Sequence, residues 1–265
     1  MYLPNYYSQG NEYCTPEKDL TYSLFPTTYF YLKLAAIFAS ANDIAVKGAY
    51  DDARWIESSH QIFKAFENAG GKICIEGIDN FRNIETPVVF VANHMSSLET
   101  LVLPCIIHPI KRVLFVMKVE LLNFPLFGAV TAAREPIVVG RTNPREDLQI
   151  VLREGKQKLA EGKSIIIFPQ KTRARTFTPK EFNSLGVKLA QRSGVPIVPI
   201  ALVTDAWLPG KLVKDFGKIN PRRTVRFSFG EPIDTSNPTE AHQKAIAYIK
   251  SKFIEWGKAD LVIEE

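Results

Sequence analysis

The spacing of apolar and polar residues separates a helical N-terminal part from a longer part in which strands and helices alternate. The stretch Tyr29–Ala41 is dense in apolar residues and carries Lys33 as its only charge. It is too short to span a bilayer, but it could form a helix in the membrane interface or simply cover the core. The stretch Asp52–Asn68 repeats large apolar side chains at helical spacing, which predicts a second helix. The polar and aromatic residues up to about Leu20 predict a loose or short helical lead-in.

From Gly70 onward the pattern switches between short apolar runs and amphipathic stretches. Almost purely apolar runs such as Pro87–Ala92 are typical of strands that are buried on both faces. The alternation predicts an α/β fold: a mixed, largely parallel central sheet flanked by helices, with an N-terminal helical membrane-docking segment. We expect residues 1–68 to hold the lead-in and the helical pair, and residues 69–265 to form the α/β domain. The expected strands are Ile73–Ile75, Pro87–Ala92, Val113–Met117, Ile137–Val139, Ser164–Phe168, Val195–Val203 and Thr224–Phe229, and the expected helices are Arg145–Glu161, Phe182–Arg192 and one from about Pro238.

Composition indicates a folded core and a mild attraction to anions. The chain has 265 residues, of which 46% are hydrophobic and 23% charged, as in ordinary globular proteins. Its net charge of +5 and its pI of about 9.0 suit a phosphate-bearing substrate, an anionic membrane or nucleic acid. Nucleic-acid binding has little support, because the cations do not interleave with aromatic residues along one face.

The cysteines and histidines argue against several kinds of site. Cys14, Cys74 and Cys105 lack CxxC spacing, so we predict neither a zinc site nor a disulfide framework, and a reducing, cytosol-facing location. None of the four histidines stands in HExxH spacing, which argues against a metal hydrolase. The N-terminus lacks the basic region of a secretory signal, and no uncharged apolar stretch of about 18 residues predicts a spanning helix.

The candidate chemistry begins where an expected buried strand ends at Asn93 and His94. The carboxyl ends of strands are where α/β sheets bind ligands. Histidine can accept a hydroxyl proton near neutral pH, and a carboxylate such as Glu99 could orient its other ring nitrogen. Two alternatives stay open. His94 could be a hydrogen-bonded core histidine, and Ser96-x-x-Glu99 is also the pattern of a helix capping box.

The stretch His94–Glu99 resembles the NHxxxxD signature of the glycerolipid acyltransferases, the family of the bacterial 1-acylglycerol-3-phosphate acyltransferases. The likeness extends from about Gly70 to Asp234, and its separate pieces occur in the family's order. After the first motif these are Lys118–Leu121 with Pro125–Gly128, the second motif Ile137–Arg141, the third motif Phe168–Arg173 (FPEGTR in the family), the Val-Pro-x-Val-Pro motif Val195–Pro199 and the closing Phe229–Ile233.

This resemblance implies an acyltransferase domain over residues 69–265 and a specific reaction. A fatty acyl thioester of coenzyme A or acyl carrier protein would acylate the free sn-2 hydroxyl of 1-acylglycerol-3-phosphate, forming phosphatidate in phospholipid biosynthesis. His94 matches the family's general base, and Glu99 matches the carboxylate that orients it. The thioester is a co-substrate, and the resemblance implies neither a metal nor a tightly bound cofactor.

The resemblance also assigns the acceptor phosphate to two arginines, which are Arg141 and Arg173 here. A guanidinium binds phosphate through two parallel hydrogen bonds, which gives orientation as well as charge. Lys171 and Thr172 lie on the same short segment as Arg173, with a further cation at Arg175. Cations gathered on one loop repel each other unless an anion is bound, so the loop itself favours an anion site.

Three residues depart from the family pattern and keep other functions open. Glu99 replaces an aspartate, Gln170 a glutamate and Lys171 a glycine. The altered third motif would suit another lysophospholipid or aminolipid acceptor, or a non-catalytic lipid-binding protein. Since the substrates are amphiphiles, we expect a monotopic or peripheral protein on the cytoplasmic face of a membrane, with the membrane lipid surface, the thioester and the lysophospholipid acceptor as its partners.

Overall fold

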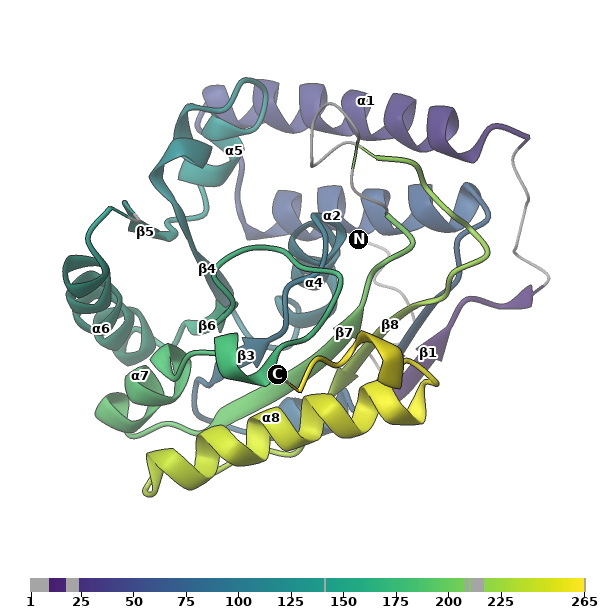
Figure 1. Ribbon diagram of the computed structural model, residues 1–265. Helices are drawn as coiled ribbons and strands as arrows, with labels where there is room; N and C mark the ends of the chain where they lie inside the picture. The colour runs from purple at the N-terminus through teal and green to yellow at the C-terminus, as the bar shows by residue number, and fades with distance from the viewer. Residues whose placement is uncertain (1–9, 18–23, 141, 208–209, 211–216, 265) are drawn as a thin grey trace.

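The computed structural model describes residues 10–17, 24–140, 142–207, 210 and 217–264. Helices and strands alternate along most of this length, as the sequence pattern predicts (Figure 1). The strands are β1 (Glu12–Cys14), β2 (Ile73–Glu76), β3 (Val89–Ala92), β4 (Val113–Lys118), β5 (Ile137–Val139), β6 (Ser164–Ile167), β7 (Ile197–Val203) and β8 (Val225–Phe229). The α-helices are α1 (Pro26–Val46), α2 (Asp52–Asn68), α3 (Asp79–Arg82), α4 (Leu98–Ile107), α5 (Gly128–Ala132), α6 (Pro144–Ala160), α7 (Leu185–Ser193) and α8 (Pro238–Glu255). Short 3₁₀ helices are η3 (Val119–Asn123), η4 (Pro179–Glu181) and η5 (Ala259–Leu261).

The strands form one sheet of eight in the order β1-β2-β8-β7-β3-β6-β4-β5. The five neighbours from β7 to β5 are all parallel to one another, whereas β8 runs antiparallel to β7 and β1 antiparallel to β2. This confirms the mixed, largely parallel sheet. Because parallel strands end at the same edge, the loops after β3, β4, β5, β6 and β7 meet there.

Helices cover both faces of the sheet. In Figure 1, α1 and α2 lie along the top of the view and α8 along the bottom, with α7 next to α8 and α6 beyond α7 at the left. The side chains of Phe30 in α1 and of Phe63 and Phe66 in α2 are almost completely buried in the same hydrophobic core as the strands. The N-terminal helical pair therefore packs on the sheet. Among the described helices, none combines the length and apolarity needed to cross a bilayer.

A proline is accommodated inside β7. Pro199 lies next to Ile200, which forms the last residue pair with β8, at Phe229. Beyond that point the chain continues as Gly230, whose N–H donates to the Pro199 carbonyl at 2.8 Å. A Cβ atom on Gly230 would stand 2.8 Å from the proline ring, so a residue without a side chain is needed beside it.

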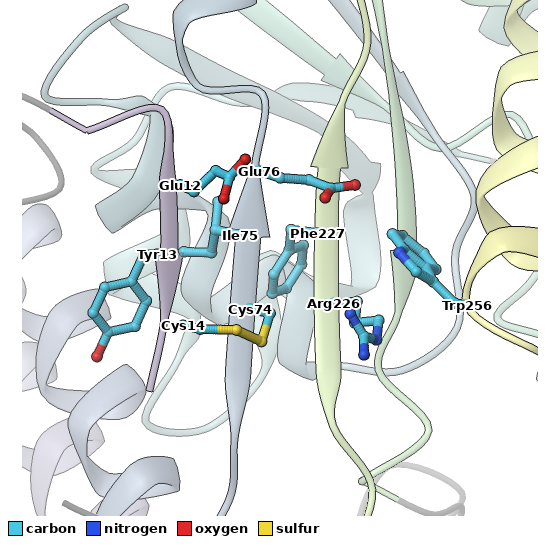
Figure 2. Close-up of a pocket in the computed structure, with 9 residues that line it drawn as sticks. All are labelled: Glu12, Tyr13, Cys14, Cys74, Ile75, Glu76, Arg226, Phe227 and Trp256. Carbon is cyan, nitrogen blue, oxygen red and sulfur yellow. A yellow bond between two sulfur atoms is a disulfide. The ribbon is translucent and has the colours of Figure 1, made fainter. Parts of the chain in front are cut away.

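The structure corrects two predictions about the lead-in, which were a loose or short helical segment and no disulfide framework. The lead-in instead contains an edge strand, β1, and one cysteine of a disulfide bond. Cys14 and Cys74 face each other in the antiparallel pairing of β1 with β2, and they are disulfide-bonded, while Cys105 is free and buried. Figure 2 shows the disulfide lining a pocket at this end of the sheet, with Trp256 on its far side. The two cysteines are 60 residues apart, so their spacing gave no signal. Because two of the three cysteines are disulfide-bonded, the cysteines no longer support the prediction of a reducing compartment.

Candidate functional site

Three loops converge on His94 at the carboxyl edge of the parallel strands. His94 follows β3, and β3 lies between β7 and β6 in the sheet. Thr204 comes directly after β7, and Phe168 comes directly after β6. Asn93 fastens the first of these loops to β7, because its buried side chain both donates to and accepts from the Leu202 backbone at 2.9 Å. The order of the strands thus places residues that are far apart in the sequence around one imidazole.

The structure brings His94 and Glu99 together as the motif predicts. Nδ1 of His94 lies 3.0 Å from Oε1 of Glu99, whose side chain is fully buried. The same oxygen accepts the backbone N–H groups of Met95 and Ser96 at 2.6 and 2.7 Å. The other oxygen accepts the hydroxyls of Ser96 and Thr204 at 2.9 and 2.7 Å. One carboxylate therefore makes both of the contacts that the two interpretations require, with the His94 ring and with the Ser96 N–H. The capping box is only half formed, because the N-cap of α4 is Ser97 and the Ser96 hydroxyl accepts the Leu98 N–H at 3.1 Å.

The surroundings of Glu99 keep it ionised. Burial raises the pKa of its carboxyl, but the hydrogen bond and charge of His94, with the Thr204 hydroxyl and backbone donors, outweigh burial and lower the pKa. No arginine or lysine among the described residues forms an ion pair with Glu99. Its negative charge is therefore directed at the imidazole and can stabilise the imidazolium form.

The ring of His94 is held on a flat apolar surface and is partly open to solvent. Phe168 stacks on it with 4.1 Å between ring centroids and 17° between the ring planes. The side chain is 17% exposed, and Nε2 has no hydrogen-bond partner within the part of the chain that the structure describes. Since Nδ1 faces the carboxylate, Nε2 is the nitrogen that can accept a proton from a bound molecule.

Gln170 has a role that the sequence did not reveal. Its side chain is buried, and its Oε1 accepts the backbone N–H of His94 at 2.6 Å. A glutamate at this position would offer the same acceptor with an added charge, so the substitution preserves the bond. Gln170 thus faces the protein backbone, and of the two changes in the third motif only Lys171 is exposed to solvent.

The loop after β6 presents the predicted phosphate-binding residues beside His94. The Ala174 N–H donates to the His94 carbonyl at 2.9 Å, which fixes the loop to the first motif. Arg173 donates to the hydroxyl of Ser97, and Lys171 and Thr172 are exposed. Arg141 lies outside the described residues.

Two contributors to the site, Thr204 and Phe168, went unrecognised in the sequence. Thr204 is fully buried, and its hydroxyl is one of the donors that hold Glu99. A polar residue directly after a buried parallel strand was the signal that identified His94, and the same signal was present at Thr204. Phe168 was included in an expected strand, and nothing in its local pattern indicated a surface for the imidazole.

Comparison with known proteins agrees with this geometry. The acyltransferase family model matches residues 72–203, which include His94, Glu99 and the loop after β6. Through this segment the chain belongs to the acyltransferase family. A 1-acyl-sn-glycerol-3-phosphate acyltransferase of Pseudomonas aeruginosa is 34% identical over 133 residues, which is 50% of each chain. The chloroplastic enzyme of that name from Arabidopsis thaliana is 30% identical over 50% of this chain and 36% of its own length.

The chain thus spans about half the length, or less, of these curated relatives. A solved structure extends the likeness to nearly the whole fold. The crystal structure of the 1-acyl-sn-glycerophosphate acyltransferase from Thermotoga maritima superimposes with a TM-score of 0.68, covering 88% of this chain and 95% of that one. Since the two sequences are 20% identical, this match establishes the fold alone.

Proposed function

We propose that this protein transfers a fatty acyl group from a thioester of coenzyme A or acyl carrier protein to the sn-2 hydroxyl of 1-acylglycerol-3-phosphate. The observation that carries the proposal is the imidazole of His94, which has Nδ1 on buried Glu99 and Nε2 facing outward, inside the segment that the family model matches. The activities for which the curated relatives are named support this acceptor.

The geometry supports direct transfer with His94 as general base. Nε2 takes the acceptor's hydroxyl proton while the hydroxyl oxygen forms a bond to the thioester carbonyl carbon. Collapse of the tetrahedral intermediate breaks the carbon–sulfur bond, and the imidazolium returns the proton to the leaving thiolate. Glu99 stabilises the imidazolium between these two steps. Backbone N–H groups of residues 170–172 are our candidates for stabilising the oxyanion.

We further propose that cations beside His94 hold the acceptor phosphate. Arg173 is anchored next to His94 through the Ser97 hydroxyl, and Lys171 and Thr172 are exposed on the same loop. Arg141 is assigned to the phosphate by its motif alone. A phosphate bound here would place the neighbouring glycerol hydroxyl within reach of the base.

The test is an assay of the purified protein in mild detergent with acyl-CoA and a panel of lysolipids, following free thiol and product mass. We expect turnover with 1-acylglycerol-3-phosphate and a loss of at least about 10³-fold in kcat for His94→Ala. A single cooperative thermal unfolding transition in that variant is the control for folding.

Two results would change the proposal. Preference for a different lysolipid headgroup would support the second candidate acceptor, for which the exposed Lys171 is the specific observation. Absence of turnover with both acyl-CoA and acyl carrier protein thioesters would contradict the enzymatic proposal and favour a non-catalytic lipid-binding protein.

We propose that the protein works at a membrane surface, because its exposed apolar side chains are concentrated in one region. Ten large apolar side chains are exposed in the described part of the chain, and all but Ile254 and Ile263 come from two segments. One segment is α1 with the two residues before it, and the other is the 119–126 segment after β4. These two segments adjoin, since Phe38 of α1 contacts Phe127 with 5.4 Å between ring centroids. The eight side chains are Leu24, Phe25, Leu32, Val46, Val119, Leu121, Phe124 and Leu126.

The 119–126 segment begins at the carboxyl end of β4, the same edge of the sheet as His94. A bilayer in contact with these side chains would therefore present its lipids at the edge that holds the site. The acyl donors are thioesters of the cytoplasm, so we propose the cytoplasmic face of the membrane.

Flotation with anionic phospholipid vesicles tests this surface. Replacing Phe124 and Leu126 together by Ser should lower vesicle partitioning at least about tenfold, since each side chain loses apolar area that lipid would bury. The matched control is Ile254→Ser, which removes a comparably exposed apolar side chain on α8. Equal flotation of all three proteins would exclude the 119–126 segment as a membrane contact.

A further inference from the structure

One short turn connects helix α1 with the carboxylate of Glu99. The turn runs from Thr204 to Trp207 directly after β7, and the Trp207 N–H closes it by donating to the Thr204 carbonyl at 3.1 Å. Its first residue belongs to the catalytic network and its last belongs to the packing of α1. Only two residues of the chain, Asp205 and Ala206, separate these two ends.

At the α1 end the turn is held by hydrogen bonds and an aromatic contact. Nε1 of Trp207 donates to the hydroxyl of Tyr31 at 3.0 Å, and that hydroxyl donates to the Gly217 carbonyl at 2.7 Å. The buried ring of Phe30 packs edge-on against the indole at 5.1 Å between centroids. The hydroxyl of Thr27 accepts the Ile219 N–H at 3.1 Å. These contacts attach α1 to the β7–β8 connection at several points.

At the catalytic end the turn holds the first motif. The Thr204 hydroxyl donates to Glu99 at 2.7 Å and lies 2.9 Å from the Ser96 hydroxyl. The Thr204 N–H lies 3.2 Å from the sulfur of Met95. Because Glu99 orients His94, a displacement of Thr204 would alter the position of the general base.

From these contacts we infer that Tyr31 and Trp207 are positioning residues that make acyl transfer depend on the attachment of α1 to a surface. This inference rests on the proposed function and goes beyond it. The face of α1 opposite Phe30 carries exposed Phe25 and Leu32, so lipid would fix the helix from outside. The Tyr31–Trp207 hydrogen bond then fixes Thr204, and through it Glu99.

The experiment measures kcat with two acceptors that share the phosphate headgroup. One is long-chain 1-acylglycerol-3-phosphate in phosphatidylglycerol vesicles, and the other is a short-chain analogue that stays monomeric in water. We expect the wild-type protein to be faster on vesicles. Trp207→Phe keeps an aromatic ring against Phe30 but removes the N–H, and it should reduce the vesicle-to-monomer ratio of kcat about fivefold, the effect of one neutral hydrogen bond. The KM for the thioester should stay unchanged.

A double variant separates coupling from general damage. Tyr31→Phe combined with Trp207→Phe should reduce the ratio no further than Tyr31→Phe alone, because both changes delete the same bond. The matched control is Tyr248→Phe on α8, away from the turn, which removes a part-buried hydroxyl that lies 2.6 Å from the Ser228 hydroxyl of β8. This control should preserve the ratio.

Each outcome decides one claim. A wild-type protein with equal kcat on vesicles and monomers, variants with a wild-type ratio, or a control that falls equally would each overturn the coupling while the acyltransferase activity stands. Loss of turnover with both acceptors in the wild-type protein would instead overturn the proposed function.

Discussion

A histidine lies beside a carboxylate near each end of α4, yet only one of these two pairs has the features of a catalytic base. Glu99 lies in the first turn of the helix and faces His94 at 3.0 Å. His108 caps the other end, with Nε2 3.3 Å from Oδ1 of Asp52. The distances differ little, so the distance alone does not separate a site from a structural contact.

The two pairs differ in what else their members bind. Asp52 is shared with Arg134 at 2.6 Å and Arg112 at 2.9 Å, which neutralise its charge. His108 is buried, and its Nδ1 accepts the Val113 N–H at 3.1 Å. Burial lowers the pKa of His108 in spite of Asp52, so its ring is neutral at pH 7. His94, by contrast, has an outward nitrogen and a carboxylate with no other ion-pair partner among the described residues.

The largest expected effect comes from neutralising each carboxylate in turn. Glu99→Gln should lower kcat about 100-fold or more, because an amide cannot stabilise the imidazolium. Asp52→Asn should leave kcat within about twofold and instead lower stability by roughly 1–3 kcal/mol, because it disrupts contacts with two arginines and His108. Steady-state kinetics and urea unfolding of both variants provide the measurement. A comparable loss of kcat in both would show that the two pairs do not differ as argued.

The sequence predicted those strands and contacts that depend on residues close together in the chain. Apolar runs such as Pro87–Ala92 predicted the buried strands, and the five-residue interval between His94 and Glu99 predicted a contact that the structure contains. Both signals depend on neighbours within one element or one turn, where periodicity and spacing constrain geometry directly.

The parts that were not predictable depend on contacts across the sheet. Thr204 meets Glu99 only because β7 lies beside β3, and Cys14 meets Cys74 only because β1 pairs with β2. A three-residue edge strand such as β1 carries too little pattern to detect. Gln170 was interpreted as part of an altered third motif that would suit another acceptor, since the sequence could not show that its side chain turns inward.

A smaller expected effect is on the pH dependence of the free energy of unfolding. Buried Glu99 and partly exposed Asp52 should contribute to it to different extents. The pKa of Glu99 lies below its ordinary value of 4.5, so its contribution to stability is complete above that pH and is lost as pH falls through the lowered pKa. Burial raises the pKa of Asp52, but the charges of His108 and the two arginines lower it below 3.8, so its contribution has the same sign. The side chain of Asp52 is 35% exposed, and solvent screens its interactions more than those of Glu99.

We therefore expect the free energy of unfolding of the wild-type protein to decline below about pH 4.5, measured by urea titration from pH 7 to pH 3. The decline should become shallower in Glu99→Gln and change less in Asp52→Asn. In His94→Ala the pKa of Glu99 should rise towards its ordinary value, because the group that lowers it most is gone, so the decline should be smaller and should level off at a higher pH. An identical acid limb in all four proteins would show that Glu99 is not held ionised by His94, and the distinction between the two pairs would then rest on kinetics alone.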